Sequence, residues 1–352
     1  MRTLTNILAI STKPEHLQPL LLSLKSKDIT SCLFDARVLL RKYYLDVHHV
    51  RELVSLITNA DVILVDSPHM SLYIAFFITR VLRGRKPLLI RLRGVYWEEF
   101  HDWKISSKMI NPLILTDHVV SHGDLLLPNC NFLASRLGAR LRKCRLETLY
   151  NGVDLDRFKE RASTHKMRFL YDHFIIVPTN FNIARKFAGL LYFLPDIYNI
   201  AKKMDVNVVV LGANGPLKNT LTEMIRMRGW QTVFHVTYVK DIASLLSLCE
   251  AVIYPSWQDC FPQVILESAA AGKAILATNV GGIPEILQGQ CGIMIEMTDR
   301  RAFRSGMIRL LEDSNLRRRL GSSARSIISK YFIWNAISQR FLAILKQNDM
   351  LA

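Results

Sequence analysis

The chain has 352 residues, of which 50% are hydrophobic and 22% are charged, a composition typical of a folded protein and not of a disordered one. This length exceeds what one ordinary core needs, so we expect two domains. Unless the protein is simply basic, its net charge of +16 favours nucleic acid, an anionic membrane surface or a phosphate-bearing small molecule as partner.

The apolar runs and the cysteines indicate whether the protein spans a membrane and which compartment it occupies. No apolar run reaches the roughly 18 residues that span a bilayer, and the stretch 72–82, which carries Arg80, is interpreted as a buried helix. The six cysteines are scattered without a C-x-x-C pair, which argues against a zinc site or a disulfide framework and favours a reducing compartment. We therefore expect a cytoplasmic protein, with at most peripheral attachment to the cytoplasmic face of a membrane.

The first half of the chain alternates short apolar runs with helical patterns. Strands are expected at 6–10, 32–34, 62–65, 88–92, 125–128 and 146–149, and helices at 17–25, 71–82 and 131–141. The second half repeats the scheme, with strands at 174–178, 206–212, 232–239, 251–255 and 274–278 and helices at 217–228 and 242–248.

These runs are nearly continuous in hydrophobicity, as strands buried on both faces are. Two successive β-α-β series predict an α/β protein with two doubly wound parallel sheets. The boundary is expected at "LYNGVDLDRF" (149–158), where Asn-Gly marks a turn.

Two acids stand eight residues apart, Asp259 and Glu267. Asp259 falls in the loop after an expected strand, where doubly wound sheets place their ligands. A helix is expected to begin near Pro262 or Gln263, and its backbone N–H groups and dipole favour a phosphate. Glu267 falls about one turn inside. Two acceptors beside an anion-binding helix end suit the hydroxyls of a phosphorylated sugar.

The segment "PSWQDCFPQVILESAAAGKAILATNVGGIPE" (255–285) resembles the signature of family-4 retaining glycosyltransferases, which have the GT-B fold. Three other segments agree in order: "LYNGVDLDRF" is similar to the interdomain linker, "VVVLGANGPLKNTLTEMI" to the glycine-bearing strand–loop–helix, and 324–345 to the terminal segment that crosses back. The resemblance covers about 120–345. It implies an acceptor-side domain, 1–152 completed by 333–352, and a donor-binding domain, 153–332, each Rossmann-like.

The resemblance also implies roles for the residues of the motif. Glu267 takes the position that holds the nucleotide ribose. Asp259 takes the position that contacts the donor sugar, where the family has glutamate, one methylene longer. Phe261, Pro262 and Gln263 fall where backbone amides meet the sugar or its phosphate.

Positive charge for the diphosphate is implied at Lys186. The family arginine five residues earlier is replaced by Phe181, so Arg185 is the alternative source of that charge. In the first domain Arg93 stands where the family often has histidine before glycine, and we expect it, with Asp259 and Lys186, to be catalytic. Its alternative role is an ion pair with Glu98 or Glu99. Three further positions are implied in donor binding: Gly212, Tyr238 and Val239.

The function implied is transfer of a sugar, with retention, from a nucleotide-diphosphate donor to an acceptor hydroxyl, with no metal site and no cofactor. A nucleotide-sugar epimerase or phosphorylase on the same fold is the alternative. A basic nucleic-acid-binding protein is the alternative of another class, although aromatic–basic stacking motifs and zinc patterns are missing from the sequence.

The acceptor is expected to be a lipid-linked saccharide, a glycolipid or a surface polysaccharide. The motive for an anionic membrane surface is a basic cluster in the first domain, Arg136, Arg140, Arg142, Lys143 and Arg145.

Overall fold

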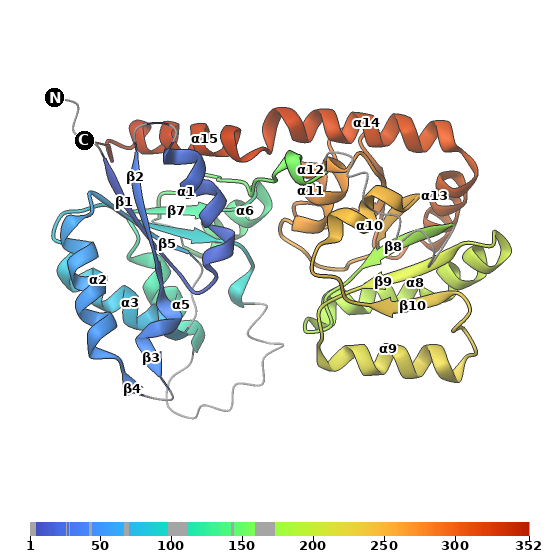
Figure 1. Cartoon of the computed structure of the whole chain (residues 1–352), viewed down its shortest axis with the longest axis horizontal. Coiled ribbons are helices and arrows are strands. Elements are labelled where there is room, and N and C mark those ends of the chain that lie inside the picture. The colour runs from blue at the N-terminus through green and yellow to red at the C-terminus, as the bar shows by residue number, and fades with distance from the viewer. Residues whose placement is uncertain are drawn as a thin grey trace. The chain divides into compact units, whose positions relative to one another are not determined.

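The protein folds into two compact units (Figure 1). The computed structural model describes residues 5–25, 27, 29–41, 44–66, 70–97, 112–141, 144–158 and 173–351. Unit 1 comprises Met1–Gly152 and Trp334–Ala352, and unit 2 comprises Val153–Ile333. Each unit contains its own parallel sheet, so the prediction of an α/β protein with two parallel sheets is confirmed.

Unit 1 is built on a five-stranded parallel sheet of order β2-β1-β5-β6-β7. Its strands are β1 (Asn6–Ser11), β2 (Thr30–Asp35), β5 (Val62–Asp66), β6 (Leu88–Leu92) and β7 (Leu125–Pro128). Its helices are α1 (Gln18–Lys25), α2 (Val47–Asn59), α3 (Met70–Leu82), α5 (Pro112–Ser121), α6 (Asn131–Arg140) and α15 (Trp334–Gln347). A small antiparallel hairpin joins β3 (Leu40–Arg41) to β4 (Tyr44–Leu45).

The C-terminal helix α15 belongs to unit 1 because its apolar face packs on α1 (Figure 1). Phe341 and Ile344 of α15 are fully buried in the same core cluster as Leu20 and Leu24 of α1. Burial of such side chains contributes roughly 1.5–3 kcal/mol each, which explains why the last helix completes the first unit.

Unit 2 is built on a six-stranded parallel sheet of order β10-β9-β8-β11-β12-β13. Its strands are β8 (Phe174–Pro178), β9 (Asn207–Leu211), β10 (Phe234–Thr237), β11 (Ala251–Tyr254), β12 (Ala274–Thr278) and β13 (Ile293–Ile295). Its helices are α8 (Ala184–Lys203), α9 (Pro216–Met227), α10 (Ile242–Leu248), α11 (Gln263–Ala270), α12 (Ile283–Ile286), α13 (Arg300–Glu312) and α14 (Ser314–Tyr331), with a short 3₁₀ helix at Leu155–Phe158.

The strand order places a switch point in each sheet. In unit 2 the chain leaves β8 for β9 and later returns to β11 on the other side of β8. In unit 1, β1 lies in the same way between β2 and β5. Doubly wound sheets bind ligands at the carboxyl ends of the strands that flank such a point. The candidate positions are therefore the ends of β8 and β11, and of β1 and β5.

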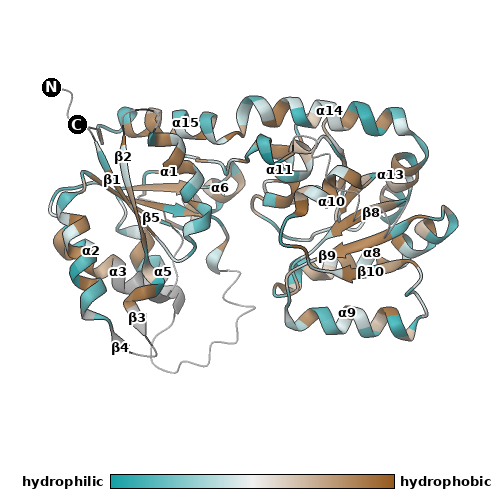
Figure 2. Cartoon of the chain, in the orientation of Figure 1, coloured by the Kyte–Doolittle hydropathy of each residue, from teal (hydrophilic) through white to brown (hydrophobic). Residues whose placement is uncertain are grey.

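The central strands carry the apolar residues that the sequence predicts to be buried on both faces (Figure 2). One expected strand is wrong: 146–149 forms only an isolated bridge, Leu146 with Leu126. Leu149 N–H still donates to the carbonyl of Pro128 at 2.9 Å, but Pro128 has no N–H to return, so the ladder stops there. Among the described helices, none combines the length and the hydropathy needed to cross a membrane.

Candidate active site

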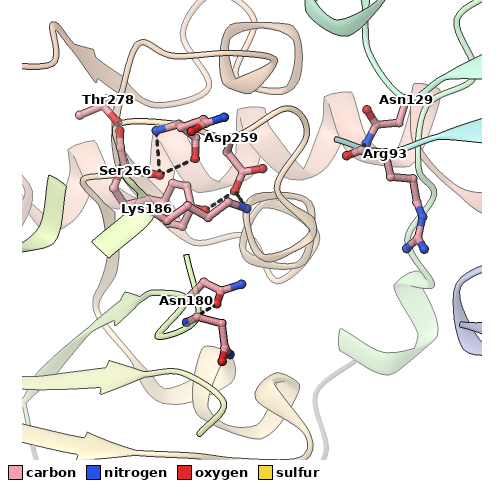
Figure 3. A network of polar contacts seen from close by, with 10 residues as sticks. Arg93, Asn129, Asn180, Lys186, Ser256, Asp259 and Thr278 are labelled. Carbon is pink, nitrogen blue, oxygen red and sulfur yellow. Dashed lines mark hydrogen bonds and ion pairs between the residues drawn. The ribbon is translucent and has the colours of Figure 1, made fainter. Parts of the chain in front are cut away.

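A buried carboxylate lies at the switch point of unit 2 (Figure 3). Asp259, in the loop after β11, is 8% exposed. Lys186 Nζ donates to its Oδ2 at 2.6 Å, and the hydroxyl of Tyr254 donates to the same oxygen, also at 2.6 Å. Lys186 lies in the first turn of α8, which follows β8, and Tyr254 is the last residue of β11. The two strands that flank the switch point thus deliver a cation and an anion to one place.

The loop that carries Asp259 is braced from β12. Thr278 Oγ1 donates to the carbonyl of Ser256, and Ser256 Oγ donates to the carbonyl of Gln258 at 2.9 Å (Figure 3). Thr278 is fully buried and Ser256 is 3% exposed, so these bonds form away from water and hold the loop in one conformation.

Gly281 packs directly on the backbone of Asp259. A Cβ atom at Gly281 would lie 1.6 Å from the carbonyl oxygen of Asp259, and the φ of Gly281 is +58°. Only glycine adopts that conformation at little cost. The turn at Gly281–Gly282 therefore supports the loop that carries Asp259.

The predicted helix start is confirmed, because α11 begins at Gln263 with Pro262 as its N-cap. That cap makes no side-chain hydrogen bond, and the first turn contains no acidic residue. No carboxylate of the helix's own first turn therefore offsets the positive end of its dipole. Such an end favours an anion.

Glu267 occupies the second turn of α11 and joins an ion-pair network. Arg157 Nη1 lies 3.3 Å from Glu267 Oε1, and its Nη2 lies 3.0 Å from Asp241 Oδ1. Burial raises the pKa of Glu267 above its ordinary 4.5, while Arg157 pulls that pKa back down. A carboxylate that loses water on burial gains most from a new donor, such as a sugar hydroxyl.

A small hollow lies beside Lys186 and Tyr254, at the carboxyl ends of β8 and β11. Thr179, Lys186 and Tyr254 are among its lining residues. Thr179 Oγ1 is buried without a hydrogen-bond partner among the described residues. The hollow therefore presents an ammonium group and a hydroxyl group to one small space.

The other predicted donor-site residues lie in unit 2 with varied exposure. Arg185 is exposed beside Lys186 in the first turn of α8. Tyr238, which follows β10, is 58% exposed, and Val239 after it is half-buried. Phe261 is 4% exposed and packs on Phe332, with ring centroids 5.8 Å apart.

Gly212 has a packing reason for being glycine. A Cβ there would lie 2.6 Å from the ring of Phe181, which is fully buried. The residue that replaces the expected arginine is thus part of the core, and the room it needs comes from Gly212.

In unit 1 the third catalytic candidate, Arg93, forms an ion pair with Asp66. Arg93 Nη2 lies 3.1 Å from Asp66 Oδ2, whereas Glu98 and Glu99 lie outside the described residues. Asp66 ends β5, is fully buried, and also accepts from Ser11 Oγ at 3.0 Å. Ser11 and Asp66 end the two strands at the switch point of unit 1.

Buried Arg91 and nearby His16 complete this cluster. Arg91 is 1% exposed and its Nη2 donates to Asn151 Oδ1 at 2.7 Å; burial lowers its pKa to about 10. Burial and the charge of Arg93 lower the pKa of His16 to about 4, so His16 is neutral near pH 7. The cluster carries two arginines against one carboxylate.

The expected basic cluster is partly offset by an acid. Arg140 Nη2 lies 2.5 Å from Asp117 Oδ2, while Arg136 and Arg145 are exposed. Arg142 and Lys143 lie outside the described residues.

Sequence reasoning missed several of these polar groups. Arg157 stood in the quoted linker but was interpreted as part of a boundary, and Tyr254 as an ordinary strand residue. Asp66 carried only one signal, its place at the end of an apolar run.

Comparison with solved structures defines the class of fold. A glycosyltransferase from Rickettsia africae is 17% identical, with a TM-score of 0.73 and 98% of both chains covered. Anabaena HepE in complex with UDP-glucose is 18% identical, with a TM-score of 0.73, 97% of this chain and 99% of that chain covered. The chain has the GT-B fold of glycosyltransferases.

The sequence relatives name the family. Residues 175–313 match the family described as "Glycosyl transferases group 1". Spore coat protein SA of Bacillus subtilis is 26% identical over 58% of this chain and 60% of its own length. N-acetyl-alpha-D-glucosaminyl L-malate synthase of Bacillus anthracis is 26% identical over 53% of this chain. The chain spans 50% to 60% of the length of these relatives. The resemblance to glycosyltransferases with the GT-B fold is confirmed.

Proposed function

We propose that the protein transfers a sugar from a nucleotide-diphosphate donor to an acceptor hydroxyl, with retention of configuration. One observation carries the proposal: Lys186, Asp259 and the start of α11 converge at the switch point of unit 2. The helix end and Lys186 suit a diphosphate, Asp259 suits a sugar hydroxyl, and Glu267 suits the ribose. Arg185, Phe261, Pro262, Gln263, Gly212, Tyr238 and Val239 complete the proposed donor site, and Arg93 is proposed on the acceptor side.

The acceptor is proposed to be a polysaccharide or a lipid-linked sugar. Two relatives support this class by their names. One is the capsular polysaccharide biosynthesis glycosyltransferase CapM of Staphylococcus aureus, 24% identical over 56% of this chain. The other is an N-acetylgalactosaminyltransferase of Campylobacter jejuni whose name includes a diphospho-undecaprenol acceptor, 25% identical over 58% of this chain. Exposed Arg136 and Arg145 would favour an anionic membrane surface.

A donor panel tests the proposed function. The purified chain is incubated with nucleotide sugars, first UDP-glucose because HepE binds it, with and without a polyprenyl-diphosphate saccharide or a capsular oligosaccharide. We expect nucleotide diphosphate to be released with a glycosylated acceptor as co-product, and the new bond to keep the donor's anomeric configuration. An altered sugar formed without acceptor would instead support an epimerase, and binding to nucleic acid alone would contradict the proposal.

We expect turnover to be unchanged by an excess of EDTA. The reason is that Lys186 and the N–H groups of α11 would supply the positive charge that a metal supplies elsewhere. The measurement is the initial rate before and after chelation. A loss of activity that Mg²⁺ or Mn²⁺ restores would show that the proposed metal independence is wrong.

Glu267→Gln is expected to weaken nucleotide binding by about 1–3 kcal/mol, since a charged acceptor for ribose hydroxyls becomes a neutral one. Calorimetric titration with UDP measures the change. Glu223→Gln is the matched control, because Glu223 is an exposed glutamate of α9 in the same unit. An unchanged dissociation constant for Glu267→Gln would remove the ribose role.

The affinity for UDP should also fall as the pH drops through the raised pKa of Glu267, above its ordinary 4.5. Protonation replaces the acceptor carboxylate by a neutral acid. A carboxyl whose pKa is raised in the folded state destabilises that state when ionised, so its protonation favours folding. Acid unfolding through Glu267 therefore does not explain the loss. The Glu267→Gln variant, which shares the titration of UDP itself, should lack this part of the pH dependence.

A further inference from the structure

The carboxylate of Asp259 is held at only one of its two oxygens. Lys186 Nζ and the Tyr254 hydroxyl both reach Oδ2, each at 2.6 Å. Among the described residues, no donor is within hydrogen-bond distance of Oδ1. One oxygen is thus anchored by two donors, and the other remains available as an acceptor for a ligand.

Tyr254 is not one of the residues proposed to contact the donor, yet its hydroxyl donates a hydrogen bond to the Asp259 carboxylate. Tyr254 is 5% exposed, so its hydroxyl would cost free energy if it were unpaired. Burial, followed by the charge of Asp259, raises the pKa of Tyr254 well above 10. The phenol therefore keeps its proton and can only donate to the carboxylate.

The two donors of Oδ2 differ in freedom of movement. Tyr254 ends strand β11, inside the sheet, and its ring is fixed by packing. Lys186 has a flexible side chain, 22% exposed, in the first turn of a helix. A bound diphosphate would compete with Asp259 for the ammonium group, because phosphate oxygens carry more charge than one carboxylate. Only the tyrosine contact would persist unchanged through that exchange.

We propose that Tyr254 is a positioning residue, which holds Asp259 through Oδ2 so that Oδ1 accepts a hydroxyl of the donor sugar. This inference rests on the proposed transferase function. The proposed role of Tyr254 also gives a reason for aspartate, and not glutamate, at position 259. The Asp259 carboxylate lies within hydrogen-bond distance of the Tyr254 hydroxyl, and one further methylene would shift the carboxylate away from that hydroxyl. Tyr254 would act on the bound sugar only through Asp259, and the nucleotide part of the donor would not depend on it.

The Tyr254→Phe variant tests the proposal, with UDP and UDP-glucose as separate probes. We expect the dissociation constant for UDP to change by less than about twofold and that for UDP-glucose to rise about five- to tenfold, the usual cost of one hydrogen bond. Turnover should fall by a similar factor. Equal changes for both probes, or none for UDP-glucose, would overturn the proposal.

Two further measurements keep the result specific. Tyr192→Phe is the control for loss of a tyrosine hydroxyl, because half-buried Tyr192 also donates a hydroxyl hydrogen bond in unit 2, to Thr298 O at 3.1 Å. It should leave the ratio of the two dissociation constants unchanged. The double variant Tyr254→Phe with Asp259→Asn should lose no more affinity for UDP-glucose than Asp259→Asn alone, since the tyrosine acts through the acid. Additive losses would contradict this.

Crystal structures of the wild-type chain and of Tyr254→Phe, each with UDP bound, supply a readout that does not depend on the donor sugar. With the diphosphate engaging Lys186, we expect the Asp259 carboxylate to keep its position in the wild-type chain and to rotate away in the variant. A carboxylate that stays in place in the variant would overturn the proposal. Failure of the wild-type chain to bind any nucleotide sugar would instead count against the proposed function.

Discussion

Replacing Lys186 by alanine is expected to lower kcat by about 10²–10³-fold, the usual cost of removing one preorganised group that stabilises developing charge. The donor KM should change by less, within about threefold, because negative charge on the diphosphate grows as the glycosidic bond breaks. A cation at that position therefore interacts more strongly with the transition state than with the bound donor. Initial rates at several donor concentrations measure both constants.

The structure gives this lysine the means to act in that way. Its Nζ lies 2.6 Å from a carboxylate that is 8% exposed, so the local medium is poor in water and charges act strongly. The first turn of α8 directs the side chain to the carboxyl ends of β8 and β11. Loss of the ammonium group would leave Asp259 with Tyr254 as partner, so the carboxylate itself would stay in place.

Two variants of the same helix control the experiment. Lys203→Ala removes an exposed lysine from the last turn of α8 and should leave both constants unchanged. Arg185→Ala removes the neighbouring positive charge. If Lys186→Ala has normal turnover and Arg185→Ala does not, Arg185 is the cation that neutralises the diphosphate.

Much of the fold was predictable because parallel strands buried on both faces leave an unambiguous pattern. The strands 88–92, 125–128, 174–178 and 274–278 agree with the structure to the residue. The strand predicted at 146–149 does not form because the neighbouring strand β7 ends in Pro128. Proline has no backbone N–H, so the ladder of hydrogen bonds cannot continue past the bridge at Leu146. The hydrophobic pattern of a segment indicates whether that segment is buried. It does not indicate whether the neighbouring strand has the backbone N–H groups needed to pair with it.

The candidate site divides in the same way. The start of α11 follows from Pro262, a local signal. The contact of Lys186 with Asp259 joins residues 73 apart, and without the resemblance to a family nothing in the sequence would pair them. Arg93, expected to be catalytic, pairs with Asp66, an acid that sequence reasoning did not connect with it. That pairing follows from the register of β5 with β6, where Asp66 is the partner of Arg91.

Phe181 shows a third kind of limit. The family that the chain resembles has an arginine at this position. In this chain the ring of Phe181 is fully buried there and packs against Gly212 and Phe187. A charged guanidinium could not replace it there without a large desolvation cost. We therefore expect the positive charge of the proposed donor site to come from the first turn of α8, supplied by Lys186 or Arg185.

The second large effect is expected at Asp259. Asp259→Asn should lower kcat by about 100-fold or more, since it leaves Lys186 without its anionic partner and replaces a charged acceptor for the sugar hydroxyl by a neutral one. Asp259→Glu should retain substantial activity, within about tenfold of the wild-type chain, because the charge is kept and the family has glutamate at this position. Rates with the donor found in the panel measure both variants.

Space around the acid decides how well glutamate is tolerated. The side chain of Asp259 is enclosed by Lys186 and Tyr254, and its backbone is fixed by Gly281. Because Gly281 packs on the backbone of Asp259, we expect the loop to stay in place and the longer side chain to extend its carboxylate into the proposed donor site. If Asp259→Glu is inactive while Asp259→Asn is active, the charge at this position is not what the reaction uses, and Asp259 would instead be a structural partner of Lys186.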